Sequence, residues 1–103
     1  MTPRYLLRPE AQADIEESAL WYEDQRPGLG ERFTGELFVL IDRIAEFPLQ
    51  FPVIGRSVRR GLLQRFPYAV YFLVAEGPVV VIAVLHQPRS GGLAAPSVRR
   101  SPK

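Results

Sequence analysis

Seven consecutive residues late in the chain, 79–85, are all apolar (Val-Val-Val-Ile-Ala-Val-Leu). A strand with one face in water alternates apolar and polar residues, so this run predicts a strand with two apolar faces. Such a strand either lies centrally with both faces covered or leaves an apolar face for a partner. Two helices of a 103-residue chain can cover only one face properly. We therefore expect another molecule, or another copy of the chain, to cover part of the second face.

Two upstream segments carry apolar residues at helical spacing. In the first, 9–24, the stripe recurs at i, i+4, i+8 and i+11 and consists of Ala11, Ile15, Ala19 and Tyr22. In the second, 29–47, the stripe consists of Leu29, Phe33, Leu37, Leu40, Ile41, Ile44 and Phe47. Pro48 ends the second helix, because the residue before a proline avoids the helical region. With a break at 25–28 between them, the two segments predict an antiparallel αα-hairpin.

Extended segments surround this hairpin, at 4–7, 57–64, 68–75 and 79–86. Pro67 separates two of them, and the Glu-Gly-Pro sequence at 76–78 predicts a tight hairpin turn between the last two. Residues 48–55, which include two prolines, are expected to be an irregular connector. The predicted order is β-α-α-β-β-β, an α+β fold in which an antiparallel sheet packs on the αα-hairpin.

The chain divides into one folded domain, 1–89, and a tail, 90–103. The tail is rich in Gly, Ser, Pro and Ala and ends with the basic residues Arg99, Arg100 and Lys103. This composition predicts a flexible basic tail.

The net charge of +2 conceals a division between the two halves of the chain. Residues 1–48 hold five arginines and ten acids, a net of −5, whereas residues 49–103 hold eight basic residues and one acid, a net of +7. Twelve of the thirteen basic residues are arginine, which indicates either recognition of phosphate and carboxylate groups or codon bias in a GC-rich genome. Codon bias does not explain where the charge lies, so partners are expected on the strand-forming half.

Several classes of protein are excluded. Without cysteine there is no disulfide framework, thiolate zinc site or thiol nucleophile, and one histidine does not make a transition-metal site. Gly-Leu-Gly at 28–30 lacks the third glycine and the preceding strand of a dinucleotide-binding loop and is interpreted as a helix cap. The acids at 16–17 and 23–24 indicate a solvated helical face rather than a cation site. No transmembrane run or signal peptide is visible. We expect a cytoplasmic protein with no cofactor, metal or membrane partner.

A group of basic residues carries the clearest chemical signal. Its members on or beside the strand at 57–64 are Arg56, Arg59, Arg60 and Arg65, and His86 and Arg89 lie at and after the last strand. Because side chains two apart share a face, Arg59 and Arg65 are expected to point one way and Arg60 the other. The group could bind a nucleic-acid backbone and, with His86 as acid or base, promote phosphodiester cleavage. It could equally bind acidic side chains of a partner or solubilise a sheet face, with His86 in a structural role.

Aromatic residues lie close to this basic group along the chain, and they are Phe66, Tyr68, Tyr71 and Phe72. Each could stack on a nucleic-acid base, but their spacing and apolar neighbours favour a place in the core.

An ordered series of motifs extends over residues 4–89. The motifs are Pro9-Glu10-Ala11-x-x-Asp14-Ile15-x-Glu17, Trp21-Tyr22, Pro27-Gly28-Leu29-Gly30-x-x-Phe33, Pro48-x-x-Phe51-Pro52, Val58-Arg59-Arg60, Arg65-Phe66-Pro67-Tyr68 and Ala83-Val84-Leu85-His86-x-x-Arg89. The series resembles the ParE branch of the RelE/ParE superfamily, the toxins of type II toxin–antitoxin (plasmid stabilisation) systems. The resemblance implies a β-α-α-β-β-β toxin held inactive in a hetero-oligomer with a cognate, ParD-like antitoxin.

The superfamily offers two targets. ParE-like members inhibit DNA gyrase and thereby arrest growth, which implies no catalytic residue here and a binding role for Arg56, Arg59, Arg60, Arg65, His86 and Arg89. RelE-like members cleave mRNA on the ribosome, which implies phosphate clamping by Arg59, Arg60 or Arg65 and acid–base catalysis by His86. The chain lacks the C-terminal tyrosine and the lysine pair of many ribonuclease members, since its last tyrosine is Tyr71. These departures favour a gyrase-binding toxin, with the ribosome-dependent endoribonuclease as the alternative and a plain assembly module as a third class.

Overall fold

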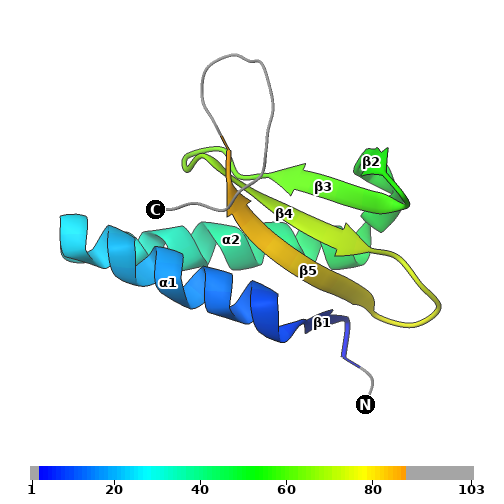
Figure 1. Cartoon of the computed structure of the whole chain (residues 1–103), viewed down its shortest axis with the longest axis horizontal. Helices are drawn as coiled ribbons and strands as arrows, with labels where there is room; N and C mark the ends of the chain where they lie inside the picture. The colour runs from blue at the N-terminus through cyan, green and yellow to red at the C-terminus, as the bar shows by residue number, and fades with distance from the viewer. Residues whose placement is uncertain (1–2, 88–103) are drawn as a thin grey trace.

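The computed structural model of the chain describes residues 3–87. A short first strand, β1 (Tyr5–Leu7), precedes two helices, α1 (Pro9–Gln25) and α2 (Leu29–Glu46). A 3-10 helix, η1 (Pro48–Gln50), then leads into the remaining strands, which are β2 (Val53–Gly55), β3 (Val58–Leu62), β4 (Tyr68–Leu73) and β5 (Val79–His86). This arrangement confirms the α+β class predicted from the sequence (Figure 1). The tail 90–103 and Arg89 lie outside the described residues.

The strands form one mixed sheet in the order β1-β5-β4-β3-β2. It differs in two ways from the wholly antiparallel sheet expected. First, β1 runs parallel to β5. The helices lead the chain from β1 to β2 at the far edge of the sheet, and three successive antiparallel pairings then bring β5 beside β1 in the parallel direction. Second, the connector at 48–55 is not irregular throughout, since it supplies η1 and the edge strand β2. A hydrogen bond from the Arg60 amide to the Pro52 carbonyl (3.1 Å) anchors this edge.

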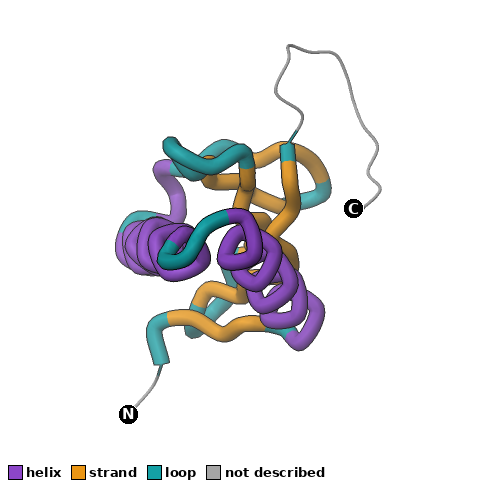
Figure 2. Tube along the Cα trace, turned by 90° about the vertical axis from the view of Figure 1, so that its left-hand side faces the viewer, coloured by secondary structure: helices purple, strands orange, loops and turns teal. Residues whose placement is uncertain are grey.

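Both helices pack on the same face of the sheet (Figure 2). The core between the helices and the sheet contains Ala11, Ile15, Phe33, Leu37, Ile41, Ile44, Leu63, Val70, Phe72, Val79, Val81 and Val84. The helical stripes predicted from the sequence therefore point into the core, except at the two ends of the second one. Its first residue, Leu29, is not part of the core. Phe47 adopts a non-helical backbone conformation before Pro48 and is 47% exposed, so the helix ends one residue earlier than expected. Neither helix of the described part is long and apolar enough to cross a membrane.

The turn between the helices explains the Gly-Leu-Gly sequence at 28–30. Gly28 adopts a left-handed conformation with φ of +90°. The Glu23 carboxylate accepts hydrogen bonds from the amides of Gly28 (2.9 Å) and Gly30 (3.0 Å), which lack partners at a helix start. A Cβ on Gly30 would lie 2.5 Å from the Ala19 carbonyl oxygen, so only glycine allows the helices to come this close. The interpretation of these glycines as a helix cap is confirmed.

The apolar run of β5 has a structural explanation. The register between β4 and β5 shifts by one residue, since Tyr71 pairs with Ala83 and Phe72 with Val81. Ile82 is the additional residue of this β-bulge, which changes the alternation along the strand. The residues that face the helices and are buried are therefore Val79, Val81 and Val84. The intervening residues, although equally apolar, face the other side of the sheet.

That other side is called the outer face below. Three rows of paired residues cross it, and they are Leu6–Val80–Leu73–Val58, Ala83–Tyr71–Arg60 and Leu85–Ala69–Leu62. All are apolar except Tyr71 and Arg60. Leu6 and Leu62 are 47% and 54% exposed, although both are large apolar side chains. Within residues 3–87, both helices lie on the opposite side of the sheet, so the outer face remains uncovered (Figures 1 and 2).

Candidate binding surfaces

The basic residues singled out in the sequence do not form one group. The β2–β3 hairpin, with Arg56, and the loop 63–67, with Arg65, lie at opposite ends of the sheet (Figure 1). The loop lies beside the end of β5, because the Gln87 amide donates to the Pro67 carbonyl (2.7 Å). β3 ends at Leu62, so Arg65 does not share a strand face with Arg59 as expected.

Arg59 and Arg60 point to opposite faces, as predicted for neighbours in a strand. Arg59 pairs with Phe72 and therefore faces the helices. Its half-buried guanidinium donates to the Phe51 carbonyl and fixes the connector against β3. Arg60 pairs with Tyr71 and faces outward, where it is the one charged residue in the three rows of the outer face. A guanidinium set among apolar side chains is suited to an apolar partner that carries an acid.

Arg56 occupies the tip of the β2–β3 hairpin. Gly55 pairs with Val58, which leaves Arg56 and Ser57 as a two-residue loop. Their φ angles of 48° and 69° define a type I′ turn, which normally takes Asn-Gly or glycine. The turn holds the Arg56 side chain exposed at the end of the sheet. The structure thus places Arg56 in solvent, at the end of the sheet opposite the loop that carries Arg65 (Figure 1).

His86 closes β5 and lies against an aromatic cluster. Its ring packs edge-on against Tyr68 with a centroid separation of 5.3 Å. Tyr68 in turn contacts Tyr22 and Phe33, so His86 stands at the exposed rim of the core. Within residues 3–87, no carboxylate forms an ion pair with His86, so no acid orients the imidazole for proton transfer. This geometry agrees with the structural role considered for His86.

Tyr22 occupies the centre of that cluster. Burial raises the pKa of Tyr22 to about 12, and the neighbouring Tyr68 adds to the shift. The phenol therefore stays protonated at neutral pH. Of the four aromatic residues weighed for base stacking, Phe72 is fully buried, and Phe66 and Tyr68 pack against the core. Tyr71 differs, because it lies on the outer face and accepts a hydrogen bond from Gln87 Nε2 (2.9 Å).

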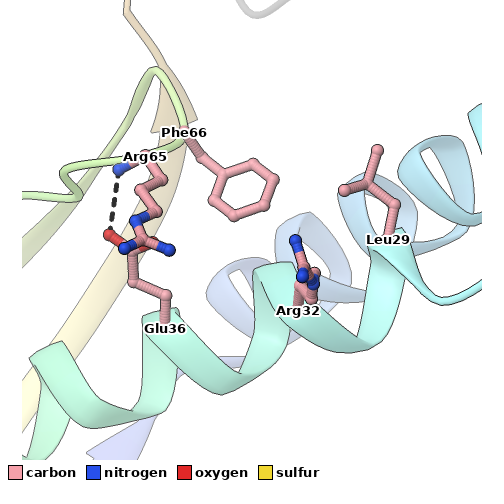
Figure 3. A pocket seen from close by; sticks show the side chains of 5 residues that line it. All are labelled: Leu29, Arg32, Glu36, Arg65 and Phe66. Atoms are coloured by element: carbon pink, nitrogen blue, oxygen red, sulfur yellow. Dashed lines mark hydrogen bonds between the residues drawn. The ribbon is translucent and has the colours of Figure 1, made fainter.

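An open pocket of about 380 Å³, which the sequence did not reveal, lies between α2 and the loop 63–67. It is lined by Leu29, Arg32, Glu36, Arg65 and Phe66 (Figure 3). The first three residues are spaced i, i+3 and i+7, which places them on one face of α2. The spacing can be recognised in the sequence, but no sequence pattern indicates that the loop 63–67 packs against this face of α2. Glu36 Oε2 joins the loop to the helix by accepting hydrogen bonds from the amides of Gln64 (2.7 Å) and Arg65 (3.1 Å).

The acidic residues of the helices do not assemble a metal site. Within the part of the chain that the structure describes, no group of three or more His, Cys, Asp or Glu side chains could hold a metal ion. Besides Glu36, two of the acids have structural roles instead. Glu23 caps α2, and Asp14 Oδ2 accepts from the Val84 amide (3.0 Å), which ties α1 to the bulged strand.

Fold and surfaces together define a small α+β protein with an apolar outer sheet face and, on the helical side, a pocket lined by two arginines. The chain belongs to the family of ParE toxins of type II toxin–antitoxin systems, parDE, whose family model matches residues 5–91. The resemblance identified from the sequence motifs is thus confirmed. No curated protein sequence matches the chain.

A solved structure described as the chromosomal ParDE toxin–antitoxin system from P. aeruginosa has a chain of similar fold. It superposes with a TM-score of 0.74 at 16% sequence identity. The match covers 85% of the present chain and 97% of the other. At this identity the similarity concerns the fold alone.

Proposed function

We propose that this ParE-family toxin is held inactive by a cognate antitoxin and, when released, inhibits DNA gyrase in the cytoplasm. The observation that carries the proposal is the outer face, an apolar sheet surface left uncovered in a chain that belongs to a toxin–antitoxin family. Large apolar side chains such as Leu6 and Leu62 are half exposed there. Most other residues of the three rows are partly exposed, and Ala69 is buried. Exposed apolar surface on one face of a sheet is typical of protein–protein contact sites.

The outer face also has the chemistry of a protein-binding site. Its rows combine aliphatic residues with the aromatic Tyr71 and the cation Arg60. Apolar interface centres that contain tyrosine and arginine are typical of protein recognition. The structurally similar protein belongs to a system described as ParDE toxin–antitoxin, which supports an antitoxin as the partner here.

A gyrase inhibitor agrees better with the geometry than a ribonuclease does. The alternative mechanism needs His86 and the arginines around one phosphate. Arg59 faces the helices and donates to a backbone carbonyl, Arg60 faces outward, and Arg65 lies in a loop. This dispersion supports action through binding surfaces rather than through a catalytic centre.

A pair of assays tests the proposal. The purified toxin is added to gyrase with relaxed plasmid and, separately, to ribosomes programmed with mRNA. We expect loss of supercoiling, reversal of that loss by antitoxin, and intact mRNA. Cleavage of mRNA in the ribosomal A site with unaffected supercoiling would refute the gyrase proposal and favour the ribonuclease.

The uncovered face makes a further prediction about the isolated toxin. We expect it to self-associate or precipitate, and to become monodisperse when mixed with its antitoxin. Sedimentation velocity with and without antitoxin measures this. A stable, monodisperse monomer at high concentration in the absence of any partner would contradict the role given to the outer face.

A further inference from the structure

We propose that the pocket between α2 and the loop 63–67 binds an acidic side chain of the antitoxin, next to a large apolar side chain of the same segment. The inference rests on the proposed function, because it assigns the antitoxin a second contact on the helical side of the molecule. The outer face does not include any of the pocket residues, so the two surfaces are separate.

The charges of the pocket favour a carboxylate. Two guanidiniums, Arg32 and Arg65, line it together with one acid, Glu36. The Glu36 carboxylate is already engaged by the backbone amides of the loop. Within residues 3–87 neither guanidinium forms an ion pair, since the one such pair joins Arg4 and Asp42. Two planar donor groups thus remain available to a carboxylate, which arginine binds with paired hydrogen bonds.

The walls of the pocket favour an apolar neighbour for that carboxylate. Leu29 and Phe66 face the space between α2 and the loop, with the Phe66 ring between Arg65 and Leu29 (Figure 3). At about 380 Å³ the pocket lies near the lower end of the range for ligand sites, which suits one or two side chains rather than a large cofactor.

The pocket is also preorganised, because its side chains and backbone are held in place without a ligand. Phe66 packs edge-on against Tyr22 (4.9 Å between centroids) and Phe33 (5.3 Å), which holds its ring in place. The two amides bound by Glu36 hold the backbone at Arg65. Little ordering of the loop is needed on binding, and preorganisation of this kind increases affinity.

The test uses the full-length toxin and the antitoxin encoded beside it. Isothermal titration gives the dissociation constant for the wild type, for the double variant Arg32→Gln/Arg65→Gln, and for a control, Arg26→Gln/Arg43→Gln. The control removes the same charge from exposed residues outside the pocket. We expect the pocket variant to bind at least about 10-fold more weakly than the control, with a smaller dependence on salt.

The other outcomes separate this inference from the proposed function. If the wild type does not bind the antitoxin, the proposed function fails and the pocket assignment fails with it. If the wild type binds and both double variants match it, or weaken equally, the pocket assignment alone is wrong. Thermal denaturation checks folding. Should the glutamine pair fail to fold, Arg32→Lys/Arg65→Lys replaces it and is expected to lose affinity, because lysine lacks the paired donor geometry.

Discussion

Substitution of Gly30 by alanine tests the packing of the helical hairpin. The new Cβ would lie 2.5 Å from the Ala19 carbonyl oxygen and 3.1 Å from the Glu23 side chain, so the helices must separate. Overpacking of this kind costs about 1–3 kcal/mol. Weakening of the Glu23 hydrogen bonds adds about 1 kcal/mol. The higher helix propensity of alanine offsets about 1 kcal/mol of this loss in the free energy of unfolding. We expect a net loss of about 2 kcal/mol, which lowers the melting temperature by about 8–16 °C.

Gly35 supplies the matched control in the same helix. A Cβ added there meets nothing within 4 Å, and the residue is exposed. Gly35→Ala should therefore stabilise the protein by about 1 kcal/mol through helix propensity alone. Urea unfolding of both variants, in complex-free toxin at low concentration, measures the difference. Equal stabilities for Gly30→Ala and Gly35→Ala would refute the close helix contact on which the account of the hairpin depends.

Three further predictions concern the turn, the loop and the aromatic cluster. Ser57→Gly should stabilise the β2–β3 hairpin by about 1 kcal/mol, because φ of 69° is left-handed, and urea unfolding would show no gain if the turn were unstrained. Glu36→Ala should expose the Gln64 and Arg65 amides to faster hydrogen exchange and cost about 2 kcal/mol, whereas unchanged exchange of both amides would contradict the loop anchor. Because the folded pKa of Tyr22 lies above its usual 10, stability should fall as pH rises from 10 to 12, and Tyr22→Phe should remove that part of the dependence in pH-dependent melting.

The helices and long strands could be predicted from the sequence because their signals are local. Apolar spacing placed both helices, Pro48 ended the second one, and the apolar run located β5 with the bounds observed, Val79–His86. The short strands were predicted only in part. β1 lies within the extended segment expected at 4–7, but its parallel pairing with β5 joins residues more than 70 positions apart, which no local pattern indicates. β2 lies in the segment expected to be an irregular connector, and its three residues are too few for a periodic pattern.

The face of the sheet to which each arginine points depends on the pairing register of the strands, and local sequence patterns do not determine that register. Arg59 faces the helices because it pairs with Phe72, and a slip of one residue would have turned it outward. The sequence predicts Arg65 on or beside the strand at 57–64, yet the chain leaves the sheet after Leu62, and Glu36 holds the loop. The contact between Glu36 and Arg65 spans 29 residues, so no local pattern could indicate it.

The apolar run at 79–85 left two alternatives open, and the structure decides part of that choice. β5 is central, between β1 and β4, but the helices cover one face only. The bulge at Ile82 brings Val84 into the core, so burial accounts for three of the seven residues of the run. The other four, which are Val80, Ile82, Ala83 and Leu85, are only partly buried. Packing within residues 3–87 does not require apolar side chains at these four positions, where polar ones would aid solubility. Contact with a second molecule is the function that gives these residues a physical reason.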